Sequence, residues 1–206
     1  MAPPILSQDL LEKTLEIALS TGADYADVYA QKRKTTGLSL DNGEIRSSAA
    51  GQTAGVGIRV TKGASTAYAH SEDLSPDAIL DCARTVSKLA KDNPNTSTNI
   101  ALTSREGGSF ARAIIPPANI TLEDRLALLQ RGEAKARSLR NDIDRILGYY
   151  GDTDEVIQIA TSDGDLFSDS RCICRLSLRT IIKDKDGKRR VGVSGGGNRE
   201  GFSYFS

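Results

Sequence analysis

The sequence predicts an α+β fold in which antiparallel meander sheets pack with amphipathic helices. Asn42-Gly43 separates two runs of alternating residues, and this pair favours a two-residue type I′ turn because both central positions need positive φ. Helical periodicity flanks these runs, at residues 7–20 and 75–90. After the turn, apolar residues of one parity alternate with glycines, as expected for a strand with one buried face: Ala54, Val56, Ile58 and Val60 against Gly55 and Gly57.

The composition is that of an ordinary globular protein. Hydrophobic residues make up 38% of the 206 residues and charged residues 26%. Lys plus Arg equals Asp plus Glu at 27 each, which argues against direct binding to nucleic acid or an anionic membrane. No apolar run approaches the roughly 20 residues of a membrane span, and the first residues lack a signal-peptide pattern. Three cysteines give no disulfide framework, so we expect a cytoplasmic protein.

The elements divide the chain into two parts and a connection. Residues 1–92 read as a helix N-capped by Ser7, an antiparallel meander, and a second helix that opens at Ser75-Pro76. Residues 93–120 gather Pro and Gly and predict a long connection. Residues 121–206 read as a helix N-capped by Thr121, followed by strands at 145–150, 155–161 and 171–183. The two parts form related helix-plus-meander units if the chain is a diverged duplication, an interpretation that stays open.

Glycines supply the candidate binding positions. Gly55 and Gly57 leave bare backbone on one strand face. Such glycines usually mark close packing or a bulge, which we favour, but they also leave room for an extended ligand strand. In the tail, Gly195, Gly196 and Gly197 could cradle an anion only ahead of a helix; no helix pattern follows, so we expect a flexible turn there.

No catalytic or metal-binding residue is predicted. His70 is the one histidine in the sequence and is expected at a strand end or on the surface. Cys172 and Cys174 share one face of the strand at 171–183, where core packing is favoured over metal binding because further ligands are lacking. The opposite, basic face of this strand is expected to be solvated.

An ordered set of short motifs resembles the N-terminal half of TldD/PmbA proteins, which have long been labelled modulators of DNA gyrase. The resemblance covers essentially the whole chain and lies nearer the TldD branch. The motifs are Ala-Asp-Tyr-Ala-Asp-Val-Tyr at 23–29, Asp-Asn-Gly-Glu-Ile at 41–45, Gly-Val-Gly-Ile-Arg-Val at 55–60, Tyr-Ala-His-Ser-Glu-Asp-Leu at 68–74, Ser-Asp-Gly at 162–164, Asp-Ser-Arg at 169–171 and Ser-Gly-Gly-Gly at 194–197.

The resemblance implies a cytoplasmic zinc metallopeptidase that acts on unfolded peptides, commonly with a TldE/PmbA-like partner. The family's zinc site, a His-Glu-x-x-x-His helix, belongs to the C-terminal half, and this motif is absent from the sequence. We therefore expect a substrate-binding and assembly portion, inactive alone, that holds a peptide by strand addition near Gly55, Gly57 and Gly195 to Gly197. The alternative function is a stand-alone, non-enzymatic binding module or a partner subunit of a TldE-like protein. The expected partner is a TldE/PmbA-like protein or a second copy of the chain.

Overall fold

The computed structural model describes residues 4–89, 99–105 and 115–205. Within these residues the helices are α1 (Gln8–Leu19), α2 (Pro76–Leu89) and α3 (Leu122–Leu139), with short 3₁₀ helices η1 (Pro117–Asn119) and η2 (Phe202–Phe205). The strands are β1 (Tyr25–Asp41), β2 (Glu44–Lys62), β3 (Ser65–Ser71), β4 (Thr103–Arg105), β5 (Ile143–Thr161), β6 (Asp165–Lys183) and β7 (Arg189–Asn198).

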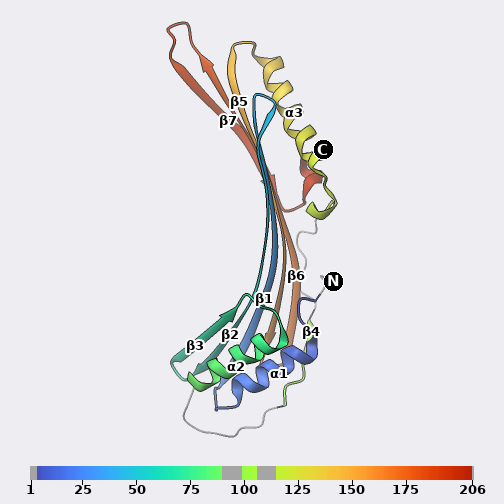
Figure 1. The fold of residues 1–206 in the computed structure, drawn as a ribbon, viewed down its shortest axis with the longest axis vertical. Coiled ribbons are helices and arrows are strands. Elements are labelled where there is room, and N and C mark those ends of the chain that lie inside the picture. Colours follow the sequence, from blue (N-terminus) through green and yellow to red (C-terminus); the bar gives the residue numbers. More distant parts are fainter. Residues whose placement is uncertain (1–3, 90–98, 106–114, 206) are drawn as a thin grey trace. The chain divides into compact units, whose positions relative to one another are not determined.

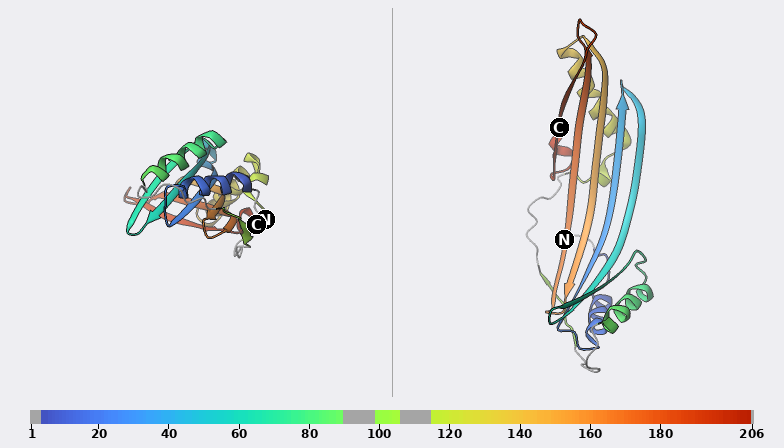
Figure 2. Two further views of the ribbon diagram at one scale, coloured as in Figure 1. Left: turned by 90° about the horizontal axis from the view of Figure 1, so that it is seen from below. Right: turned by 90° about the vertical axis from the view of Figure 1, so that its left-hand side faces the viewer.

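The strands form a mostly antiparallel sheet in the order β3-β2-β1-β5-β6-β4, with β7 also paired to β6. The β2–β3 and β6–β7 pairs are antiparallel, while the short β4 runs parallel to the start of β6. Figure 2 shows β1 and β2 running beside β5 and β6. Together with the three helices, this sheet confirms the predicted α+β class.

The chain divides into two compact units whose segments interleave. Of the described residues, unit 1 contains 4–33, 53–89, 99–105 and 155–170, and unit 2 contains 34–52, 115–154 and 171–205. Strands β1, β2, β5 and β6 contribute residues to both units. The sequence predicted a different division, into residues 1–92 and 121–206, joined by a connection at 93–120. That division follows the order of the sequence rather than contacts in space, and it stays a prediction.

Unit 1 buries its helices against one face of its strands, and α1 packs beside α2 (Figure 1). Helix α1 begins where predicted, because the Ser7 hydroxyl accepts a hydrogen bond from the Leu10 N–H at 3.4 Å. The apolar stripe of α1 and the even-numbered side chains of β2 meet in this core. Its fully buried members include Leu11, Leu15, Val28, Ile58, Ile79 and Val86.

Unit 2 packs α3 against a second core. Thr121 and Asp124 form a capping box at the start of α3, as the sequence predicted. Leu129 is fully buried against the strands, and the rings of Phe202 and Phe205 meet Tyr150 edge-on at centroid distances of 6.0 and 6.1 Å. The core consists of Leu38, Leu40, Leu128, Leu129, Tyr150 and Cys174.

The Asn42-Gly43 turn agrees with the sequence, but the prediction of two strands at 145–150 and 155–161 is wrong. Asn42 and Gly43 have φ of 51° and 83°, as a type I′ turn requires. Residues 143–161 form the single strand β5 instead of two, because Asp152 in the middle is buried in an ion pair rather than placed in a turn. The predicted connection contains β4; its residues 93–98 and 106–114 lie outside the described residues.

Candidate functional site

The three tail glycines lie in strand β7, so the prediction of a flexible turn is wrong. Gly195, Gly196 and Gly197 pair with Ser177, Leu176 and Arg175 of β6. Among the described residues β6 is the one sheet neighbour of β7, so the other edge of β7 is unpaired. The side chains of Val191 and Val193 in the same strand are 52% and 69% exposed. The structure thus presents an exposed strand edge with glycines along it.

Two of these glycines are required by close backbone pairing. A Cβ atom built on Gly195 would lie 2.5 Å from the Leu176 carbonyl oxygen, and one on Gly197 would lie 2.5 Å from the Cys174 carbonyl oxygen. A side chain at either position would push β7 away from β6. Gly196 differs in that a Cβ atom built there would meet a side chain rather than the backbone, 3.3 Å from the Tyr204 hydroxyl oxygen. The glycine run therefore builds the edge itself.

Gly57 lies inside the sheet of unit 1 rather than at an edge, and Gly55 lies one residue before the paired stretch of β2 and β3. Strand β2 is paired there with β3, and Gly57 faces His70 in the register. The Tyr68 ring covers Gly57, since a Cβ atom built there would lie 2.3 Å from the Tyr68 hydroxyl oxygen. A ligand strand could approach Gly57 only if this ring moved, whereas the backbone of β7 is already exposed. Gly55 and Gly57 stay predicted binding positions that no observation tests.

The described residues do not bring together a metal-ligand set. They contain no group of three or more His, Cys, Asp or Glu side chains that could hold a metal ion. His70 is exposed and stacks on Tyr68 with ring centroids 5.9 Å apart. Cys172 and Cys174 are buried as predicted, and burial raises the pKa of the Cys172 thiol to about 12. Near pH 7 such a thiol is neutral.

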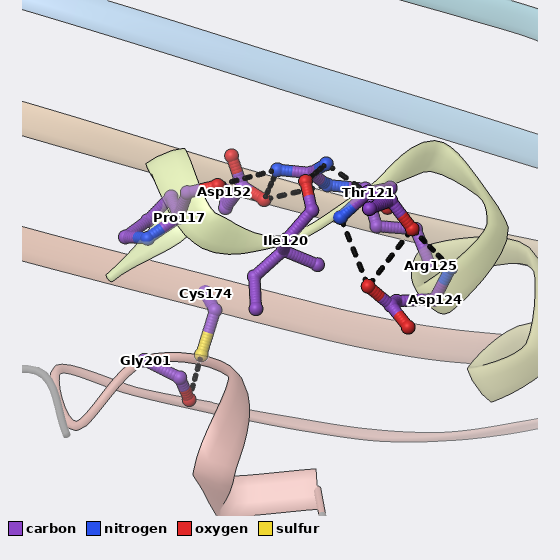
Figure 3. Close-up of polar contacts among 8 residues, drawn as sticks. All are labelled: Pro117, Ile120, Thr121, Asp124, Arg125, Asp152, Cys174 and Gly201. Carbon is purple, nitrogen blue, oxygen red and sulfur yellow. Dashed lines mark hydrogen bonds and ion pairs between the residues drawn. The ribbon is translucent and has the colours of Figure 1, made fainter. Parts of the chain in front are cut away.

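A buried ion pair that the sequence analysis missed fixes the start of α3 (Figure 3). The Arg125 guanidinium donates to one Asp152 carboxylate oxygen through Nε at 2.9 Å and Nη2 at 2.7 Å. Their side chains are only 7% and 2% exposed. Arg125 also donates to the backbone carbonyls of Pro117 at 3.1 Å, Ile120 and Thr121. One side chain thus holds η1 and the α3 N-terminus on β5, with its charge neutralised.

The face of the unit 2 strands opposite α3, which we call the open face, is not covered by any described helix. Because side chains alternate along β6, Cys172 and Cys174 point to the core while Ile173 and Arg175 point to the open face. A shallow hollow of about 520 Å³ lies here. Its lining residues come from β1, β2, β5 and β6 and include Gly37, Ala49, Gly51, Tyr149, Gly151, Ile173 and Arg175.

Comparison with known proteins agrees with this architecture. Residues 26–90 match the PmbA/TldA metallopeptidase domain 1, and residues 115–206 match the PmbA/TldA metallopeptidase central domain. The chain belongs to the PmbA/TldD metallopeptidase family. It is 27% identical over its full length to a TldD metalloprotease homologue of Haemophilus influenzae, and 28% identical over 93% of its length to one of Buchnera aphidicola from Schizaphis graminum.

The chain spans about two fifths of the length of these relatives, 42% and 39% respectively. Solved structures share its fold at low sequence identity. A protein of Thermotoga maritima named a modulator of DNA gyrase matches 94% of this chain and 44% of its own at a TM-score of 0.73 and 13% identity. TldE of Thermococcus kodakarensis matches 92% of this chain and 43% of its own, at a TM-score of 0.66 and 15% sequence identity. Among the described residues, no helix is long and apolar enough to cross a membrane.

Proposed function

We propose that this chain is the N-terminal, peptide-holding portion of a TldD-type metallopeptidase, and that β7 holds the peptide by strand addition. The observation that carries the proposal is the unpaired edge of β7. An extended peptide can hydrogen-bond there through its main chain, with little demand on its side chains. This mode suits unfolded peptides, because their backbone groups are free to pair.

The edge of β7 is better suited to a new strand than the other edge of unit 2, residues 44–52 of β2. That segment carries Glu44 and Arg46, and charges on an edge strand oppose further pairing. Strand β7 begins with Arg189 and Arg190, but its residues 191–198 carry no charged side chain, and Gly195 to Gly197 have no side chain that could cover the backbone. Val191 and Val193 offer apolar contacts to alternate side chains of the added strand.

The hydrolytic step lies outside the residues that the structure describes. Their thiols, carboxylates and one imidazole do not form a zinc-ligand set, so no step is assigned to a metal held by them. The resemblance implies that zinc is bound by the C-terminal half of full-length family members. In this proposal the present residues bind and align the peptide, and the cytoplasm is the compartment.

We propose a TldE-like protein as the assembly partner, with self-association as the alternative. The support is the TldE structure of Thermococcus kodakarensis, which shares this fold. Light scattering of the 206-residue chain, alone and mixed with a TldE-like protein, should show a stable hetero-complex. A homodimer unaffected by the added protein would contradict this assignment.

Peptide binding is tested by fluorescence anisotropy with a labelled, unstructured twelve-residue peptide. We expect binding to the wild-type chain, and at least about tenfold weaker binding when alternate peptide nitrogens are methylated, since each lost hydrogen bond contributes about 1 kcal/mol. The two sets of alternate positions should differ, because only one set faces β7. Equal binding by the methylated and unmethylated peptides would contradict strand addition.

A further inference from the structure

The open face of unit 2 combines exposed apolar side chains with glycines. Tyr149 is 46% exposed and Ile173 is 49% exposed, and both line the hollow. Gly151 makes room for the Tyr149 ring, since a Cβ atom built there would lie 2.5 Å from the Tyr149 hydroxyl oxygen. Gly37 also lines the hollow, and a Cβ atom built there would lie 3.7 Å from the Tyr149 hydroxyl oxygen. The hollow is therefore a shallow, mainly apolar recess with an aromatic wall, large enough to take a bulky apolar side chain.

The charges around the hollow are unbalanced. Asp152 contributes to its lining, but its carboxylate is neutralised by Arg125. Arg175 is exposed, and among the described residues it has no ion-pair or side-chain hydrogen-bond partner. The hollow thus carries one unneutralised guanidinium, whose planar fork matches a carboxylate. Charge complementarity points to an anionic group beside the apolar side chain.

We propose that the hollow binds the C-terminal residue of a peptide, with its apolar side chain between Tyr149 and Ile173 and its α-carboxylate at Arg175. Ile173 and Arg175 are two residues apart on one strand, about 6.5 Å by strand geometry. The side chain and carboxylate of a single residue can span this separation. The inference rests on the proposed function in one respect, that the ligand of this chain is a peptide.

Backbone hydrogen bonding favours a peptide terminus over an internal acidic residue. Strands β1, β5 and β6 under the hollow are already paired on both sides, so a peptide lying across them would find no free backbone partners there. A peptide running across this face would leave several N–H and C=O groups against apolar side chains, which is costly. A terminal residue inserted end-on brings one peptide group and one carboxylate, and Arg175 satisfies the carboxylate.

The test compares two octapeptides that end in Phe, one with a free carboxylate and one amidated, in titrations of the full chain. We expect the amide to bind at least about tenfold more weakly, as for loss of a hydrogen bond to a charged group. Arg175→Gln should abolish the difference between the two peptides. Arg179→Gln is the matched control, because Arg179 lies on the same face of β6 and does not line the hollow; it should keep the difference.

Ile173→Glu provides a second variant, which should weaken binding of the free acid while the circular dichroism spectrum stays unchanged. Equal binding of acid and amide to the wild type would overturn the inference. So would an amidated peptide with an internal Asp that binds as tightly as the free acid, or a self-association that Ile173→Glu removes. The proposed function and this inference can fail independently. Methylation of peptide nitrogens tests strand addition at the β7 edge, whereas amidation of the peptide C-terminus tests binding in the hollow.

Discussion

Replacement of Arg125 by Ala should weaken the attachment of α3 to β5. The substitution leaves the Asp152 carboxylate, whose side chain is 2% exposed, buried without its counter-ion. It also removes the donor to the backbone carbonyls of Pro117 in η1 and of Ile120 and Thr121 just before α3. Breaking a buried pair from one side costs about 3–5 kcal/mol. This is a large fraction of the 5–15 kcal/mol that typically stabilises a domain.

The assay is urea unfolding followed by circular dichroism, with hydrogen exchange of the α3 and β5 amides. Arg140→Ala is the control, because Arg140 and Asp142 form an ion pair in which both side chains are about half exposed; we expect little change. Replacing both buried partners, Arg125→Met with Asp152→Leu, should recover much of the lost stability, because no unpaired charge remains. The reasoning is refuted if Arg125→Ala is as mild as Arg140→Ala.

Three further predictions concern glycine, thiol and core positions. Gly195→Ala should lower the free energy of unfolding in urea by about 1–3 kcal/mol, because the added Cβ atom meets the backbone of β6. Gly57→Ala should change it by under about 0.5 kcal/mol, because its Cβ atom meets only the exposed Tyr68 ring. Equal costs for the two variants would contradict this reasoning. Burial raises the pKa of Cys172 from 9.0 to about 12, so folding favours the neutral thiol. The neutral thiol of Cys172 contributes to the free energy of unfolding below about pH 9, and this contribution is lost as the pH rises to about 12. Between these pH values the Cys172→Ala variant should therefore lose less stability than the wild type. Parallel pH profiles of the two proteins would exclude the effect. Leu129→Ala should cost about 2–5 kcal/mol and lower the thermal midpoint, and an unchanged midpoint would mean that α3 packs elsewhere.

Local rules predicted the parts of the fold that local interactions determine. Ser7 and Thr121 begin helices because their hydroxyls accept N–H donors within the next three residues. Asn42-Gly43 forms its turn because the required φ values suit these two residues. Side-chain alternation correctly placed Cys172 and Cys174 in the core. Each of these predictions depends on a short stretch of chain.

The remaining features depend on partners distant in sequence. Gly195 to Gly197 have low strand propensity, and they are extended because β6 pairs with them. Arg125 and Asp152 are 27 residues apart, and neither has a pattern that predicts their contact. A helical Arg at a core-facing position was the available signal, since an unpaired buried cation is too costly. The hollow is formed by four strands, so only their lateral order brings its residues together.

Hydrogen exchange of the β7 amides, with and without a saturating unstructured peptide, tests strand addition most directly. We predict slower exchange at alternate residues between Val191 and Gly197, because the N–H groups facing the unpaired edge become hydrogen-bonded. The amides of residues 44–52 in β2 and of Ser65–Ser71 in β3 should exchange at unchanged rates. Protection at either of those edges, or unchanged exchange along β7 with peptide bound, would contradict the account.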